Sequence, residues 1–300
     1  MQFNLLMPMR AVKHYDRWIG DGHLSDVALL AEEAGFAGVA MTDHPFPDDA
    51  WLAEGGHHSF DPFVALSFMA AATDRVRLLT FVLVAGYRNP YVAAKALASL
   101  DKLSGGRVIA GMAAGYLTAE FEVLGAEWEG RGPRFDAAID AMRAAWTGET
   151  VDISGDFAAR GHTQLPRPGQ TNGPPIWIGG NSKRARRRAA EHGDGWIPLG
   201  QPAAMATITR TPPLETVDHL ATLVADGQQD RAAVGRRPLE ICFAPFGDRS
   251  EPAAWAAQVR RDLGAYEDAG VTWLTLEPHA RTLTDLRQAV SILADQVIGS

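Results

Sequence analysis

The feature that most constrains the fold of this 300-residue chain is a regular alternation of short apolar runs with amphipathic segments. Eight runs are almost continuously apolar instead of alternating apolar with polar residues, which is typical of parallel strands buried on both faces. We therefore expect eight strands, at residues 3–8, 38–42, 76–84, 108–112, 176–178, 195–198, 239–245 and 271–276.

Between these runs, apolar residues recur every three or four positions, which is the spacing of one face of an α-helix. The clearest stripes lie within residues 24–34, 93–103, 135–146 and 283–297. Alternating strands and helices predict a parallel sheet, and eight repeats predict its closure into a single (β/α)8 barrel of the TIM type over residues 1–300. An open doubly wound sheet is the alternative, but no Gly-x-Gly-x-x-Gly fingerprint follows the first strand.

Two longer segments interrupt the repeat. Residues 44–61 are rich in His, Pro, Asp and Gly, and residues 148–174 are rich in Gly and Pro. Long loops in a compact domain are commonly functional or mobile. We expect both segments to form insertions at the rim of the barrel.

The composition argues against several classes of partner. The net charge of −8 disfavours binding to nucleic acid or to anionic membranes. The single cysteine, Cys242, lies in an apolar run, so we expect it to pack in the core, and it allows neither an internal disulfide nor a cysteine metal cage. The first residues lack the pattern of a signal peptide, and no apolar run approaches about 20 residues. We expect a cytoplasmic protein that acts on a small molecule.

The chemistry of a parallel barrel lies at the carboxyl ends of its strands. The second strand is followed by Asp43 and His44, a carboxylate beside an imidazole that can transfer a proton near neutral pH. The plain alternative is a turn-forming Asp and a surface His. The fourth strand is followed by small residues up to Tyr116, which leave room for a flat ligand or simply make a tight loop. Residues 86–90 require nothing more than a turn and a helix start.

The fifth strand runs into two glycines, Asn181 and Ser182, at the start of a helix. Glycines let backbone N–H groups approach an anion, and a helix amino terminus favours negative charge. Ser182 is a natural N-cap. Lys183 and Arg184 follow in the first turn, where the helix dipole disfavours cations and where a bound phosphate would offset them. The alternative is that the basic run 183–188 is a solvated helix face; we favour the phosphate site.

The adjacent pair His57 and His58 is not expected to bind a metal, because neighbouring residues rarely point at one ion. The chain contains neither a His-Glu-x-x-His motif nor a Gly-x-Ser-x-Gly elbow. We interpret both histidines as loop residues that could line a substrate pocket, and we expect no metal site.

The ordered set of segments resembles the bacterial luciferase-like superfamily over about residues 3–200. The most specific segments are Thr-Asp-His at 42–44, Leu-Ser-Gly-Gly-Arg at 103–107 and Pro-Pro-Ile-Trp-Ile-Gly-Gly at 174–180. The Asp-His pair is similar to that of the branch that uses coenzyme F420, an 8-hydroxy-5-deazaflavin. The resemblance implies a redox enzyme with this cofactor, and we further expect a homodimer.

The resemblance also implies residue roles. Asp43 would contact the cofactor, and His44 would transfer a proton or contact the substrate. A non-prolyl cis peptide would buttress the cofactor ring at Phe81–Val82. The ends of the third and fourth strands and the phosphate segment would complete the cofactor site. The contacts would come from Val84, Ala113, Gly179, Gly180, Asn181 and Ser182.

One departure bears on the substrate. Sugar-phosphate dehydrogenases of the branch carry an acidic Glu where this chain has Tyr116. The resemblance therefore supports neither a sugar phosphate nor the oxidative direction. It implies reduction of an activated C=C or C=O bond by hydride transfer from the reduced deazaflavin, with His44 or Tyr116 supplying a proton.

Three alternatives stay open at this point. A flavin mononucleotide (FMN) monooxygenase would need a similar pocket, because both cofactors have a tricyclic ring and a phosphate. A barrel that binds a ligand without turnover would be expected if residues 148–174 closed the pocket. A metal-dependent hydrolase would need His and Asp ligands at several strand ends, where only His44 and Asp43 are candidates.

Overall fold

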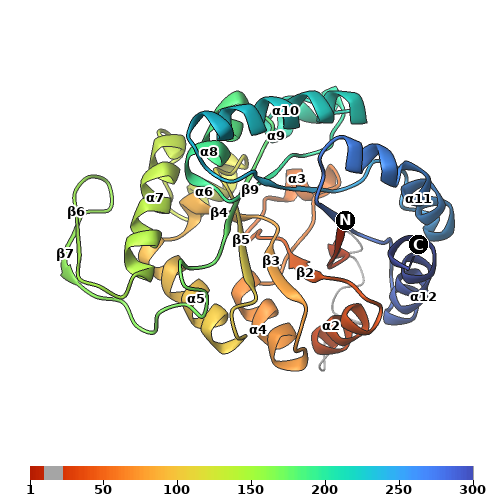
Figure 1. Ribbon diagram of the computed structural model, residues 1–300, viewed down its shortest axis with the longest axis horizontal. Coiled ribbons are helices and arrows are strands. Elements are labelled where there is room, and N and C mark those ends of the chain that lie inside the picture. Colours follow the sequence, from red (N-terminus) through yellow and green to blue (C-terminus); the bar gives the residue numbers. More distant parts are fainter. Residues whose placement is uncertain (10–22, 300) are drawn as a thin grey trace.

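The computed structural model describes residues 1–9 and 23–299. Its centre is a closed ring of parallel strands surrounded by helices (Figure 1). Leu78 lies opposite Val108 across the pairing that closes the ring. Around the ring, the strands follow the order β3 (Arg77–Thr80), β2 (Gly38–Met41), β1 (Gln2–Leu6), β11 (Trp273–Leu276), β10 (Glu240–Phe243), β9 (Gly195–Ile197), β8 (Ile176–Gly179) and β5 (Val108–Ala113).

The predicted (β/α)8 barrel is confirmed, and each predicted run supplies one strand of the ring. The run at 76–84 is divided, because a cis peptide bond between Phe81 and Val82 separates β3 from the short β4 (Leu83–Val84). β4 continues along β5, where Val84 lies opposite Ala113.

Helices cover the outside of the ring (Figure 1). The longer ones are α2 (His23–Glu33), α4 (Pro62–Ala72), α5 (Pro90–Leu103), α7 (Arg131–Trp146), α8 (Lys183–His192), α10 (Val217–Ala233), α11 (Pro252–Asp268) and α12 (Leu283–Leu293). Shorter elements lie in the connections, namely α3 (Asp49–Ala53), α6 (Thr118–Val123), α9 (Ala203–Thr209), a 3-10 turn at Ala85–Tyr87 and a π turn at Ala294–Ile298. None of the described helices is both long and apolar enough to span a membrane.

The interior of the barrel is filled by one residue from each strand of the ring. These residues are Leu6, Ala40, Leu79, Ile109, Trp177, Ile197, Cys242 and Trp273. Cys242 is fully buried there, and burial raises the pKa of its thiol to about 12. The interpretation of this cysteine as a core residue is confirmed. A larger apolar cluster lies between the strands and the outer helices.

The two irregular segments take different places. Residues 44–61 lie after β2 at the carboxyl ends of the strands and contain α3, which Asp48 caps by accepting a hydrogen bond from Trp51 N. Residues 148–174 begin at the opposite end, and they form the antiparallel hairpin of β6 (Val151–Ile153) and β7 (Ala159–His162), which projects beyond α7 (Figure 1). The hairpin does not line the cavity described below, but Phe157 between its strands contacts the start of α5 at the carboxyl-end side of the barrel, where Tyr91 Oη donates to Phe157 O at 2.6 Å. This agrees with the expected insertion at the rim.

Candidate functional site

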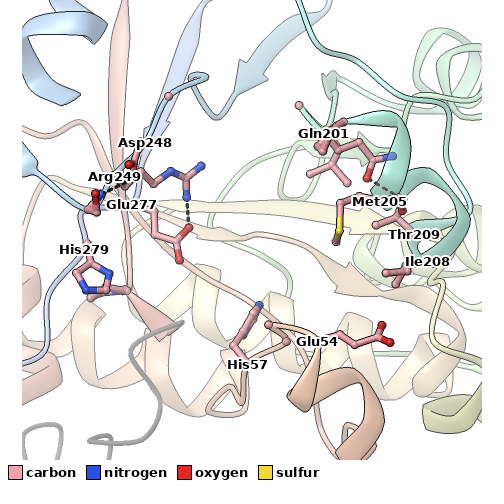
Figure 2. A pocket seen from close by; sticks show the side chains of 18 of the residues that line it. Glu54, His57, Gln201, Met205, Ile208, Thr209, Asp248, Arg249, Glu277 and His279 are labelled. Carbon is pink, nitrogen blue, oxygen red and sulfur yellow. Dashed lines mark hydrogen bonds and ion pairs between the residues drawn. The ribbon is translucent and has the colours of Figure 1, made fainter. Parts of the chain in front are cut away.

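A cavity of about 620 Å³ opens at the carboxyl ends of the strands (Figure 2). One wall is charged and comes from the loops after β10 and β11, with Asp248, Arg249, Glu277 and His279. The opposite wall comes from the β9 connection and α9, with Gln201, Met205, Ile208 and Thr209. Figure 2 shows His57 and Glu54 between the two walls, from the segment after β2. The cavity therefore lies where a parallel barrel places its chemistry.

The charged wall contains an internal ion pair. Arg249 donates to the nearly buried carboxylate of Glu277. The exposed carboxylates of Glu54 and Asp248 also line the cavity. Because Glu277 neutralises Arg249, the wall presents more negative than positive charge to a ligand.

His44 lies directly behind three side chains that line the cavity. Its ring centroid is 4.5 Å from that of Trp51, 5.0 Å from that of His57 and 6.2 Å from that of Tyr116. The structure thus brings the two predicted catalytic residues, His44 and Tyr116, to one place. His57 is buried and lines the cavity, whereas His58 is exposed and does not.

Glu120, on α6, holds the other side of the His44 ring. Its carboxylate is fully buried and lies 3.2 Å from His44 Nδ1, and it accepts hydrogen bonds from Tyr87 Oη at 2.7 Å and Phe46 N at 2.9 Å. Burial raises the pKa of the Glu120 carboxyl group, but the hydrogen bonds from His44 and Tyr87 outweigh it and hold the pKa below its ordinary value. Burial, reinforced by the neighbouring carboxylate, raises the pKa of Tyr87.

Asp43 is buried in a bidentate ion pair. Arg88 Nη1 and Nη2 donate to its two carboxylate oxygens at 2.7 and 2.8 Å, and Val84 N donates at 3.0 Å. Burial lowers the pKa of Arg88, but the bonds to Asp43 outweigh it and raise the pKa above its ordinary value. Asp43 therefore anchors β4 to the end of β2, and any contact with a cofactor would be made by oxygens that already have protein partners.

The predicted cis peptide at Phe81–Val82 is confirmed. Val82, Ala113 and Gly179 come together from three strand ends, since a Cβ atom built on Gly179 would lie 3.4 Å from Ala113 Cβ and 3.5 Å from Val82 Cγ1. All three residues are half-buried. They form a small apolar shelf that a side chain at Gly179 would cover, and this shelf fits one face of a flat ring. We call Val82, Ala113 and Gly179 the shelf.

The predicted phosphate segment begins α8 as expected, and Ser182 Oγ caps the helix by accepting from Ala185 N at 3.1 Å. Two of its amides are already used. Gly180 N donates to Ile197 O at 3.1 Å, and Asn181 N donates to Thr211 Oγ1 at 2.8 Å. The buried Asn181 side chain bonds the β9 connection at Leu199 and Pro212. Donors for an anion would therefore come from the first turn of α8, whose amides have no partner within the helix.

The basic run at 183–188 divides between two environments. Arg188 is buried and donates to Asp136 and to Gly132 O on α7, and Arg184 lies 3.6 Å from the same carboxylate. Lys183 and Arg187 are exposed. Part of the positive charge is thus offset by Asp136 rather than by a ligand.

A second pair of cations lies beside this segment. Arg131 Cζ is 3.5 Å and Arg210 Cζ is 4.6 Å from the centre of the Trp128 ring. Arg210 directly precedes Thr211, the residue that accepts from Asn181 N. Burial and the charge of Arg210 lower the pKa of Arg131. Two like charges therefore lie against the same tryptophan ring, near the start of α8.

Sequence reasoning missed the partners of both predicted polar residues. Arg88 was assigned only to a turn, and Glu120 was not singled out. A signal existed for Glu120, because it is a carboxylate next to the apolar Phe121 and three residues after Leu117, on the side of α6 that is buried. No motif pointed to Arg131, Arg210 or the charged wall. Within residues 1–9 and 23–299, no group of three or more His, Cys, Asp or Glu side chains is arranged to hold a metal ion.

Solved structures share this fold over the whole chain. The monooxygenase RslO1 from Streptomyces bottropensis superimposes with a TM-score of 0.82 at 22% identity, covering 100% of this chain and 99% of that one. An F420-dependent secondary alcohol dehydrogenase, in complex with an F420–acetone adduct, gives a TM-score of 0.70 at 17% identity, covering 99% and 98% of the two chains. At such identities the comparison establishes the fold.

Sequence relatives cover a shorter stretch. F420-dependent glucose-6-phosphate dehydrogenases from Nocardia farcinica and Amycolatopsis mediterranei are each 35% identical, over 187 and 186 residues. Each alignment covers 59% of this chain and 53% of the relative, so the chain spans about half the length of these curated relatives. The family described as luciferase-like monooxygenase matches residues 1–211, more than two thirds of the chain. By this match and by its barrel, the chain belongs to the luciferase-like monooxygenase family.

Proposed function

We propose that this protein is an F420-dependent oxidoreductase that transfers a hydride between the deazaflavin and a small organic substrate with an activated C=C or C=O bond. The observation that carries the proposal is the position of the shelf of Val82, Ala113 and Gly179. The shelf lies at the same end of the barrel as His44. Gly179 ends β8, and α8 begins a few residues later in the chain. A ring on this shelf would extend its phosphate toward α8.

The two arginines around Trp128 favour coenzyme F420 over FMN. Beyond its phosphate, the F420 tail carries carboxylates, whereas FMN ends at the phosphate. Arg131 and Arg210 stand beside Thr211 and the start of α8, where a longer anionic tail would pass. FMN would reach the first turn of α8 and would offer no carboxylate to this pair of cations. The F420-dependent relatives support the same choice.

The chain would contribute binding and proton transfer, and the bound deazaflavin would supply the carbon that carries the hydride. The shelf would support the ring, and the first turn of α8 would bind the phosphate. His44 would hold the transferable proton behind the cavity, with the Tyr116 hydroxyl as the alternative donor. Both side chains lie close to the cavity in which a substrate would sit.

The cavity favours an uncharged substrate. Glu277 neutralises Arg249, and the added carboxylates of Glu54 and Asp248 would repel a phosphate group. Met205 and Ile208 on the opposite wall would contact an apolar part of the molecule. We therefore propose a neutral carbonyl or enone compound with one polar end, and not the sugar phosphate that the dehydrogenase relatives use.

Cofactor titration tests the proposal. We expect the protein to bind F420 more tightly than FMN, and we expect Arg210→Glu to weaken F420 binding about tenfold or more while FMN binding changes less, because a hydrogen bond to a charged group contributes about 1.5–3 kcal/mol. Arg187→Glu is the matched control, since Arg187 lies exposed on α8. Tighter binding of FMN, or equal effects of Arg210→Glu on both cofactors, would contradict the assignment.

We also propose a homodimer through the outer face of α2 and α4. Leu29 on α2 and Val64 and Phe68 on α4 are 39%, 57% and 55% exposed, although all three are large and apolar. Val64 and Phe68 are four residues apart and share one helix face. Ser25 Oγ donates to Phe68 O, so the face of α2 with Ser25 and Leu29 adjoins them. Such a continuous apolar face is typical of a subunit interface.

Light scattering in solution tests this interface. We expect a mass of twice 32.3 kDa for the parent protein and a shift toward the monomer for Phe68→Asp, because a charge at the centre of an apolar interface would be desolvated without a partner. Val234→Asp, at an exposed apolar residue beyond the end of α10, is the control and should remain dimeric. A Phe68→Asp protein with the parent mass would exclude this interface.

A further inference from the structure

Glu120 is a fully buried carboxylate whose contacts come from two other strand connections. His44 and Phe46 belong to the segment after β2, and Tyr87 belongs to the turn after β4. A buried carboxylate is costly unless it is hydrogen-bonded. Tyr87 Oη and Phe46 N donate at 2.7 and 2.9 Å, so the charged form is supported from two sides. The Glu120 carboxylate is thus held in place by two contacts that do not involve His44.

The contact between Glu120 and His44 determines which ring nitrogen carries the proton. An ionised carboxylate only accepts hydrogen bonds. Glu120 Oε2 lies 3.2 Å from His44 Nδ1, so Nδ1 must be the donor in this contact. In the neutral ring, the proton therefore sits on Nδ1, and Nε2 is left as the nitrogen that can exchange a proton with a ligand.

We propose that Glu120 is a positioning residue for His44, which holds the imidazole as its Nδ1–H tautomer and stabilises the imidazolium, so that proton exchange takes place at Nε2. The use of that proton in turnover rests on the proposed function, whereas the tautomer itself does not. Tyr87 has a supporting role, because its hydroxyl shares the charge of the carboxylate. In hydrolases, a buried carboxylate fixes the tautomer and orientation of a catalytic histidine in the same way.

Other groups around the ring are compatible with this role. His57 and Tyr116 face His44 from the cavity side, at ring-centroid distances of 5.0 and 6.2 Å. The neighbouring Asp43 has its charge paired with Arg88 at 2.7 Å. Glu120 is therefore the carboxylate in direct contact with the His44 ring among the residues that the structure describes.

The first test needs neither cofactor nor substrate. The ¹⁵N shifts of histidine side chains distinguish the two neutral tautomers and follow protonation. We expect His44 to show the Nδ1–H tautomer in the parent protein. In Glu120→Gln we expect a mixture of the two neutral tautomers, because the carboxylate that accepts from His44 Nδ1 is replaced by an amide that can also donate. Glu122→Gln makes the same change at an exposed position of α6 and should match the parent.

Tyr87→Phe gives a second variant with a different expected result. It removes one donor from Glu120 but keeps the carboxylate that accepts from His44 Nδ1, so His44 should keep the Nδ1–H tautomer. A general disturbance of the site would change the tautomer in both variants. If Glu120→Gln fails to fold, an Nε2–H tautomer in the parent protein would still overturn the proposal.

The second test measures steady-state turnover with reduced F420 and an activated enone. If His44 donates the proton, kcat in Glu120→Gln should fall about tenfold or more, because part of the imidazole would be in the wrong tautomer, with KM and the Kd for F420 unchanged. A His44 spectrum in Glu120→Gln identical to that in Glu122→Gln would overturn the positioning role. Altered His44 spectra in a protein that never turns over F420 would support the role and count against the proposed function.

Discussion

Replacing His44 by alanine should lower kcat by about a hundredfold or more and leave the Kd for F420 almost unchanged. A general acid typically contributes about 10²–10⁴-fold to the rate. His44 contacts the cavity-lining side chains, while the shelf and the start of α8 lie on other strand ends. The loss should therefore appear in kcat and not in cofactor binding. Steady-state kinetics with an activated enone and F420 fluorescence titration measure the two quantities.

His58→Ala is the matched control for this prediction. His58 is exposed and lies on the same segment, next to the cavity-lining His57. It should keep the parental rate. If His44→Ala turned over at the parental rate, the proton would come from Tyr116 or from solvent, and Tyr116→Phe would then carry the defect.

The second large effect is on stability. Asp43→Ala should lower the free energy of unfolding by about 3 kcal/mol, because removing one partner of a buried ion pair leaves the other charge with less compensation. Arg88 would keep only the exposed Asp61, whose Oδ2 lies 3.2 Å from Nη2, and Val84 N would lose its acceptor. We also expect weaker F420 binding, since β4 and the adjoining Val82 would lose their anchor to β2. Urea denaturation followed by circular dichroism measures the stability change.

A double variant separates the charge effect from a simple loss of packing. Asp43→Ala combined with Arg88→Leu should be more stable than Asp43→Ala alone, because no buried charge remains and the exposed Asp61 stays hydrated. The exposed pair Asp152 and Arg160 on the β6–β7 hairpin, with side chains 77% and 80% exposed, is the control. Asp152→Ala should cost less than about 1 kcal/mol. An Asp43→Ala protein as stable as Asp152→Ala would show that the buried pair does not stabilise the barrel.

Much of the fold could be predicted from the sequence because burial on both faces of a parallel strand leaves a direct mark in the chain. The eight apolar runs became the eight strands of the ring. The family resemblance located the cis peptide at Phe81–Val82. The segment 148–174 was predicted less well, because its Gly and Pro content indicates turns but says nothing of where a hairpin points. Its base is held by Asp101, whose carboxylate accepts from Gln170 N at 2.9 Å.

The candidate site could be predicted only in part. Positions that follow a strand could be named, since every parallel strand of a barrel ends at the same rim. Their partners could not, because Arg88 is 45 residues from Asp43 and Glu120 is 76 residues from His44. Asn181 illustrates the same limit. It was expected to bind a phosphate, but its side chain bonds Leu199 and Pro212 across the next connection.

The sequence by itself determined the barrel, the strand ends that carry Asp43, His44 and Tyr116, and the capped helix start at Ser182. These features depend on local chemistry, namely apolar runs, turn residues and a side chain that bonds three residues away. Only the tertiary structure decided that Glu120 contacts His44, that Arg88 pairs with Asp43 and that the β10 and β11 loops form the charged wall. Those contacts join segments far apart in the chain, and they form only when the ring closes and its loops meet at one rim.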